Sequence, residues 1–107
     1  MKSKMIITTF ECDDSKITNI ANDLIEMQLA KCINLIPGIK SIYFWNNKLQ
    51  NSRETMMLIK TIEPNVNKIL IYLESKHPYQ IPEIICSDFE ILNDEYKQWF
   101  NTNIGNE

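Results

Sequence analysis

Several residue types are scarce in this sequence of 107 residues. It has two glycines, three cysteines and one histidine. No two cysteines form a CxxC pair, which excludes a zinc ribbon and a thioredoxin-type redox site. The odd number and wide spacing of Cys12, Cys32 and Cys86 also argue against a disulfide framework and favour a reducing compartment.

Long apolar runs and excess positive charge are also missing. No stretch approaches the roughly 20 apolar residues that cross a bilayer, and the N-terminal apolar run is too short for a signal peptide. The net charge is −3, and lysines and arginines are scattered, which argues against nucleic-acid binding. We therefore expect a cytoplasmic protein without a membrane or nucleic-acid partner.

What the chain does contain is an alternation of β-type and helical patterns. Strands are expected at Lys4–Phe10, Lys31–Trp45, Thr55–Ile62 and Ile81–Ser87. Apolar residues at helical spacing predict one helix running to about Ala30 and another from Pro64 to before Pro78. The segment "NNKLQNSRE" predicts a turn-rich hairpin, and "NDEYKQWF" a short helix capped by Asn93.

This order predicts a single α+β domain over residues 1–107, with a core from about 5 to 100 and a flexible tail at 101–107. The pattern is the β-α-β-β-α-β arrangement of ferredoxin-like folds, with two helices on one face of an antiparallel sheet. The strand Lys31–Trp45 would be about 50 Å long, against an expected radius of gyration of about 13 Å. It must bend at Pro37-Gly38, and its exposed aromatic end predicts self-association.

His77 is a candidate metal ligand, together with Cys32, because imidazole and thiolate both suit copper. The alternative is structural: Lys76 and His77 end a helix, where positive groups favour the dipole. We favour the structural interpretation. A catalytic Cys32–His77 pair is not expected, because the sequence offers no nucleophile elbow or glycine-rich loop.

Four segments resemble one known family: "LAKCINLIPGIKSIYFWNNKLQ", "ETMMLIKT", "KHPYQIPEII" and "YKQWF". In this order and spacing they are similar to CutA-type divalent-cation-tolerance proteins, from about Met5 to Phe100. The resemblance implies a ferredoxin-like protomer and a homotrimer in which extended strands pair across subunits, much as in PII signalling proteins. It implies a role in divalent-cation (copper) tolerance, by metal-linked binding or scaffolding, and no established enzymatic activity.

Individual positions match the family's patterns. His77, Pro78, Tyr79, Pro82 and Glu83 match "HPYxxPE", and Cys32 matches the family cysteine. The matches also include Tyr43, Trp45, Glu54, Lys60, Thr61, Tyr96 and Trp99. Lys76 stands where some copper-linked members have a second histidine, and "ITTF" where they have a cysteine, so we expect Cu(II) or another divalent metal to bind weakly.

The same resemblance suggests a second function. In a trimer, six of the matched residues could line a cleft between subunits: Tyr43, Trp45, Glu54, Lys60, Tyr79 and Glu83. PII-like proteins bind small effectors in such clefts, so the alternative to metal tolerance is an effector-binding regulatory trimer without physiological metal binding.

Overall fold

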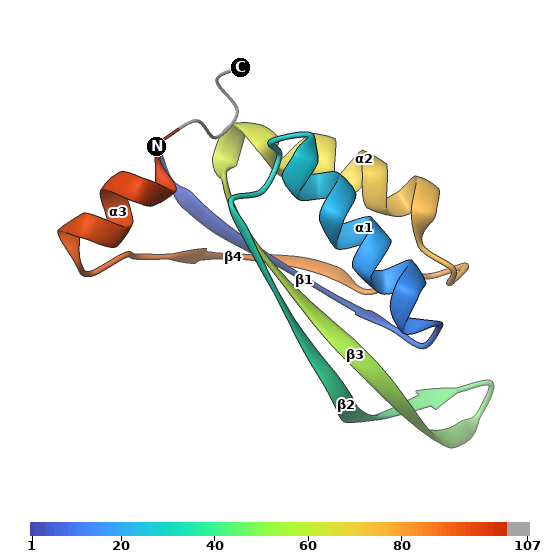
Figure 1. Cartoon of the computed structure of the whole chain (residues 1–107). Coiled ribbons are helices and arrows are strands. Elements are labelled where there is room, and N and C mark those ends of the chain that lie inside the picture. The colour runs from blue at the N-terminus through green and yellow to red at the C-terminus, as the bar shows by residue number, and fades with distance from the viewer. Residues whose placement is uncertain (103–107) are drawn as a thin grey trace.

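The computed structural model describes residues 1–102, and residues 103–107 lie outside the described part of the chain. The elements follow the predicted order (Figure 1): strands β1 (Ser3–Phe10), β2 (Cys32–Trp45), β3 (Lys48–Ile62) and β4 (Ile84–Phe89), and helices α1 (Asp14–Glu26), α2 (Val66–Lys76) and α3 (Asp94–Phe100). A short 3-10 turn, Glu63–Asn65, precedes α2. The fold is the predicted α+β, ferredoxin-like arrangement.

The four strands form one antiparallel sheet in the order β2-β3-β1-β4. Helices α1 and α2 cover one of its faces (Figure 1). The core lies between them, where strand residues such as Ile6, Met57 and Ile59 pack against Leu24 and Leu73 from the helices. Because side chains alternate along a strand, Lys60 and Ile62 point to the opposite face.

Two boundaries differ from the sequence prediction because of local backbone and pairing. Helix α1 ends at Glu26 because Gln28 takes a left-handed conformation with φ of 59°, and the amide of Leu29 then bonds to the carbonyl of Leu24. Strand β4 begins at Ile84 and continues to Phe89, because its ladder with β1 runs from Thr8–Ile84 to Ser3–Phe89.

The largest difference concerns the β2–β3 hairpin. Residues Lys48–Glu54 were expected to be turn, yet they belong to β3, and the turn itself is only Asn46-Asn47. Both asparagines have positive φ, 53° and 60°, which is the geometry of a two-residue hairpin turn. The predicted interruption at Pro37-Gly38 is confirmed as a bulge between Ile36 and Ile39.

The β2–β3 hairpin extends beyond the rest of the sheet. Strand β1 pairs with β3 only as far as Phe10–Thr55, whereas β2 and β3 pair on to Trp45–Lys48. We call residues 39–53, the two-stranded part beyond the bulge, the arm. It gives the molecule extents of 46 × 26 × 21 Å and a radius of gyration of 14.8 Å, above the roughly 13 Å of a compact chain of this length.

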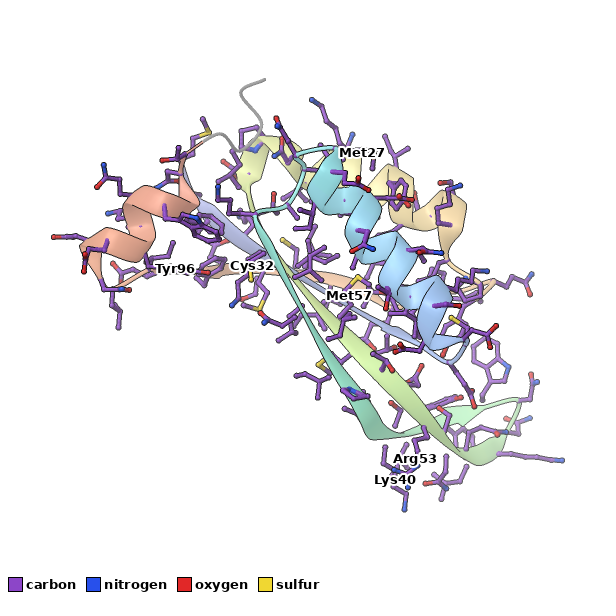
Figure 2. All side chains as sticks on the ribbon, in the orientation of Figure 1. Met27, Cys32, Lys40, Arg53, Met57 and Tyr96 are labelled. Carbon is purple, nitrogen blue, oxygen red and sulfur yellow. The ribbon has the colours of Figure 1, made fainter. Side chains whose placement is uncertain are left out.

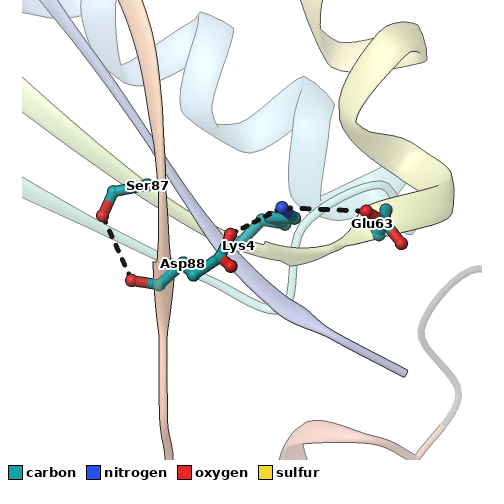
Figure 3. A network of polar contacts seen from close by, with 4 residues as sticks. All are labelled: Lys4, Glu63, Ser87 and Asp88. Carbon is teal, nitrogen blue, oxygen red and sulfur yellow. Dashed lines mark hydrogen bonds and ion pairs between the residues drawn. The ribbon is translucent and has the colours of Figure 1, made fainter.

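Helix α3 packs at one end of the sheet, on the face opposite α1 and α2. Phe100 is fully buried there with Ile62, Phe89 and Ile91. At the same end Lys4 on β1 forms ion pairs with Asp88 on β4 and with Glu63 before α2 (Figure 3). Asn101 and Thr102, which were expected in a flexible tail, bond back to Lys97 and Trp99; the rest of that tail lies outside the described residues.

Candidate functional site

The single histidine sits where α2 ends, as expected. Pro78 disfavours the helical conformation for the residue before it, and His77 is extended, with φ −66° and ψ 134°. Its amide still donates to the carbonyl of Leu73 at 2.8 Å, so His77 is the C-cap. From there the side chain turns inward and is 9% exposed.

Hydrogen bonds on both ring nitrogens fix the protonation of His77. Nε2 lies 2.9 Å from the carbonyl oxygen of Thr9 and 3.1 Å from the hydroxyl of Thr8. Because a carbonyl can only accept, Nε2 carries the proton. Nδ1 accepts the backbone N–H of Tyr79 at 3.2 Å, so it carries none. The imidazole is therefore neutral.

Burial also favours the neutral form of the His77 imidazole. It lowers the pKa of His77, although the contact with Thr9 and the charge of Glu54 oppose the shift. The ring also stacks on Phe10, with centroids 4.3 Å apart. The interpretation of His77 as a positive group suited to the helix dipole is therefore wrong, whereas its place at the helix end is confirmed.

A second buried polar group lies beside the histidine. Glu54 on β3 is 8% exposed, and its Oε2 accepts a hydrogen bond of 2.5 Å from the hydroxyl of Tyr79. Burial would raise the pKa of Glu54, but hydrogen bonds from Ser41, Tyr79 and Thr9 outweigh it and hold the pKa below its usual value. Burial and this carboxylate raise the pKa of Tyr79. In this hydrogen bond Glu54 is therefore an ionised carboxylate that accepts, and Tyr79 is a protonated phenol that donates.

The chain does not bring the two candidate metal ligands together. Cys32 pairs with Lys60 on β3, and both lie on the sheet face opposite α1 and α2. There the Cys32 thiol lies beside Tyr96 of α3 (Figure 2). His77 lies on the helix-covered side, against Thr8 and Phe10. Within residues 1–102, no three His, Cys, Asp or Glu side chains are grouped to hold a metal ion.

The residues assigned to a subunit cleft are also dispersed within one chain. Glu54 and Tyr79 are in contact. Tyr43 and Trp45 lie near the tip of the arm. Lys60 lies close to Phe89 and Tyr96. Glu83 is an exposed residue just before β4. A cleft containing all six would require more than one copy of the chain.

Sequence reasoning missed the groups that receive His77. These are the Thr8 hydroxyl, the Thr9 backbone carbonyl and the Phe10 ring, at the end of β1. A signal was present: two adjacent threonines stand in the otherwise apolar strand "KMIITTF". A buried hydroxyl requires a hydrogen-bond partner, and the one histidine of the chain provides it.

The chain therefore has a ferredoxin-like fold with a projecting hairpin and a buried network of His77, Tyr79 and Glu54. The sequence model of the CutA1 divalent ion tolerance protein family matches residues 4–103. The chain belongs to that family.

Individual relatives agree with this assignment. The chain is 35% identical over 92 residues to the divalent-cation tolerance protein CutA of Pectobacterium atrosepticum, covering 86% of this chain and 84% of that protein. It is 39% identical to human protein CutA over 89 residues, which are 82% of this chain but 50% of the human protein.

Solved structures agree as well. CutA1 from Oryza sativa superposes with a TM-score of 0.91 at 27% identity, covering 100% of this chain and 97% of that one. The divalent cation tolerance protein from Thermus thermophilus gives a TM-score of 0.87 at 31% identity, with coverages of 96% and 99%.

Among residues 1–102, no helix has the length and apolar character needed to cross a membrane.

Proposed function

We propose that this chain is a cytoplasmic homotrimer that acts in tolerance of divalent cations, copper in particular, through binding or scaffolding and not through catalysis. The observation that carries the assembly is the arm. It is a two-stranded ribbon, and such a ribbon is marginal in water on its own. It nevertheless exposes large apolar side chains: Ile42, Tyr43, Phe44, Trp45 and Leu49.

Charge supports a second copy as the partner that covers the arm. The arm, residues 39–53, contains Lys40, Lys48 and Arg53 and no acid, and Glu54 at its root is already bonded to Tyr79. Lys40 and Arg53 lie directly opposite each other across the two strands (Figure 2). Like charges in that position destabilise a strand pair, and an acidic neighbour would relieve the repulsion.

An acidic surface of that kind lies at the other edge of the sheet. Residues 77–96 contain no lysine or arginine and carry Glu83, Glu90, Asp94 and Glu95, besides Asp88, which Lys4 already pairs. Ile81, Ile85 and Leu92 of this segment are exposed. Contact between two different edges is heterologous, and a heterologous contact that closes forms a ring. In a ring of two copies, each copy would give its arm to the same neighbour from which it receives one. A trimer is the smallest ring in which each copy gives its arm to one neighbour and receives an arm from another.

We expect light scattering on the purified protein to give a mass near three times 12.6 kDa. The physical reason is the apolar surface of the arm, which favours burial by about 25 cal/mol per Å². The measurement should be made at micromolar concentration in 0.15 M salt. A mass of one chain under these conditions would contradict the proposed assembly.

For the metal, we propose weak binding by His77. Its Nδ1 is the only ring nitrogen without a proton, and it already accepts the Tyr79 amide. A metal must displace that hydrogen bond, and the half-buried Cys32 lies on the other face of the sheet. One imidazole without nearby thiolate ligands holds a metal far less tightly than a closed site.

Calorimetric titration of Cu(II) into the reduced protein should therefore give a shallow isotherm without saturation at one metal per chain. The exposed Cys86 can bind metal adventitiously, so Cys86→Ser is the control. Tight binding that persists in Cys86→Ser would contradict weak binding. A thermal shift with a nucleotide but not with metals would favour the effector-binding alternative.

A further inference from the structure

The arm joins the body of the protein at a hinge. Strand β2 bulges between Ile36 and Ile39, where Pro37 lacks an amide hydrogen and Gly38 has φ of 73°. A bulge bends its strand and interrupts the ladder. The ladder of β1 ends at Thr55, so beyond this point nothing in the described chain pairs with the other side of β3. Figure 1 shows the hairpin extending past the sheet here.

A solvent-open depression of about 220 Å³ lies beside the Phe10–Thr55 pair, between the arm root and the β1–α1 turn. Phe10–Cys12 line it on the body side, and Gly38 and Arg53–Thr55 line it on the arm side. The arm root is therefore not packed solidly against the β1–α1 turn. Close packing resists motion, and a gap of this kind permits it.

One buried side chain spans this hinge. Glu54 lies opposite Ile39, the first paired residue beyond the bulge. Its carboxylate accepts a hydrogen bond of 2.5 Å from Tyr79 on the loop before β4, and the hydroxyls of Ser41 on the arm and Thr9 on β1 help to lower its pKa. A carboxylate bound to a hydroxyl forms a strong, charge-assisted hydrogen bond.

Tyr79 is in turn fixed to the body. Its amide donates to His77 Nδ1 at 3.2 Å, and the two rings lie 4.7 Å apart. His77 is bonded to Thr9 and stacked on Phe10. The hydroxyl of Tyr79 is thus held at one position relative to β1, and the carboxylate that it binds belongs to Glu54, which pairs with Ile39 at the start of the arm.

We propose that the hydrogen bond between Tyr79 and Glu54 is a latch that fixes the direction of the arm, and that opening it lets the arm turn about Pro37-Gly38. The latch gives the α2–β4 loop control over the arm. A change in that loop, such as displacement of the Tyr79 amide from His77, would alter the freedom of the arm. The consequence for assembly rests on the proposed trimer, whereas the latch itself does not.

The test compares two tyrosines whose hydroxyls each donate to a carboxylate. Tyr79→Phe removes the latch hydroxyl. Tyr72→Phe removes a hydroxyl that donates to Asp23 at 2.5 Å, between α1 and α2 and away from the arm. We expect hydrogen–deuterium exchange at residues 36–41 and 52–56 to become roughly tenfold faster in Tyr79→Phe, the size expected for losing a hydrogen bond to a charged group. In Tyr72→Phe, exchange there should remain unchanged.

Equal exchange in Tyr79→Phe and the unsubstituted protein would overturn the latch, as would an equal acceleration in Tyr72→Phe. A second measurement addresses assembly: labelled and unlabelled trimers are mixed, and subunit exchange should be faster for Tyr79→Phe alone. A protein that light scattering finds monomeric refutes the trimer, but amide exchange at the hinge still decides the latch.

Discussion

Phe44→Asp should convert the proposed trimer into single chains. Phe44 is 68% exposed near the tip of the arm, and we expect a second copy to cover it. Losing this contact removes about 1.5–3 kcal/mol of apolar burial per copy, and the new carboxylate must also be desolvated. Light scattering should show the mass falling from near three times 12.6 kDa toward a single 12.6 kDa.

Ile71→Asp is the matched control for that change. Ile71 is 60% exposed on α2, away from the arm. It receives the same charge at a similarly exposed apolar position, and the trimer should persist. Dissociation of both variants would mean that the effect is not specific to the arm, and a trimeric Phe44→Asp would place the interface elsewhere.

The second large effect is expected at the histidine. His77→Ala removes a buried ring together with the partner of the Thr9 carbonyl and of the Tyr79 amide. We expect a loss of about 2–4 kcal/mol in the free energy of unfolding, because a cavity forms and buried polar groups lose partners. For a chain of this size the melting temperature should fall on the order of 10–20 °C.

Lys76→Ala distinguishes the two explanations of this helix end. Lys76 is the exposed basic residue in the last turn of α2, beside His77. If charge at the helix terminus were the main effect, both substitutions would cost a similar ~0.3–1 kcal/mol. We expect only Lys76→Ala to fall in that range. A His77→Ala protein as stable as Lys76→Ala would contradict the importance of the buried ring.

The same histidine should make stability depend on pH. The unfolded chain binds a proton on His77 near pH 6.5, whereas burial lowers the folded pKa. Between these two pKa values the unfolded state holds more protons, so stability falls as the pH drops below about 6.5. His77→Gln should remove this slope. Glu54, whose folded pKa is also lowered, contributes a separate loss only below about pH 4.5, and that loss should remain in His77→Gln.

The order of the elements followed from the sequence because periodicity reports which face of each segment is buried. Leu24, Ile69 and Leu73 belong to the apolar residues at helical spacing in the sequence, and all three are buried in the core. The end of α1 did not follow, because Gln28 adopts the left-handed conformation that a glycine would have indicated. The outer half of β3 did not follow either, since "KLQNSR" has no strand pattern and is extended only because it pairs with β2.

The site was predictable in part for a similar reason. The end of α2 could be predicted from Pro78, because a proline restricts the backbone of the residue directly before it. The burial of His77 depends on Thr8 and Thr9, which lie 69 and 68 positions away in the sequence. No local pattern around His77 identifies those partners. The contact of Tyr79 with Glu54, 25 positions apart, was hidden in the same way.

The position of β1 in the sheet also constrains how the chain folds during synthesis. Of the four strands this is the first to be made, yet it lies between β3 and β4, and its partners are residues 55–62 and 84–89. A nascent chain that has just completed α1 therefore carries an apolar strand with neither neighbour available. The last pairing must wait until β4 has left the ribosome, when most of the described chain has been made. Contacts between residues so distant in sequence slow folding, so β1 should remain exposed to chaperones until late in translation.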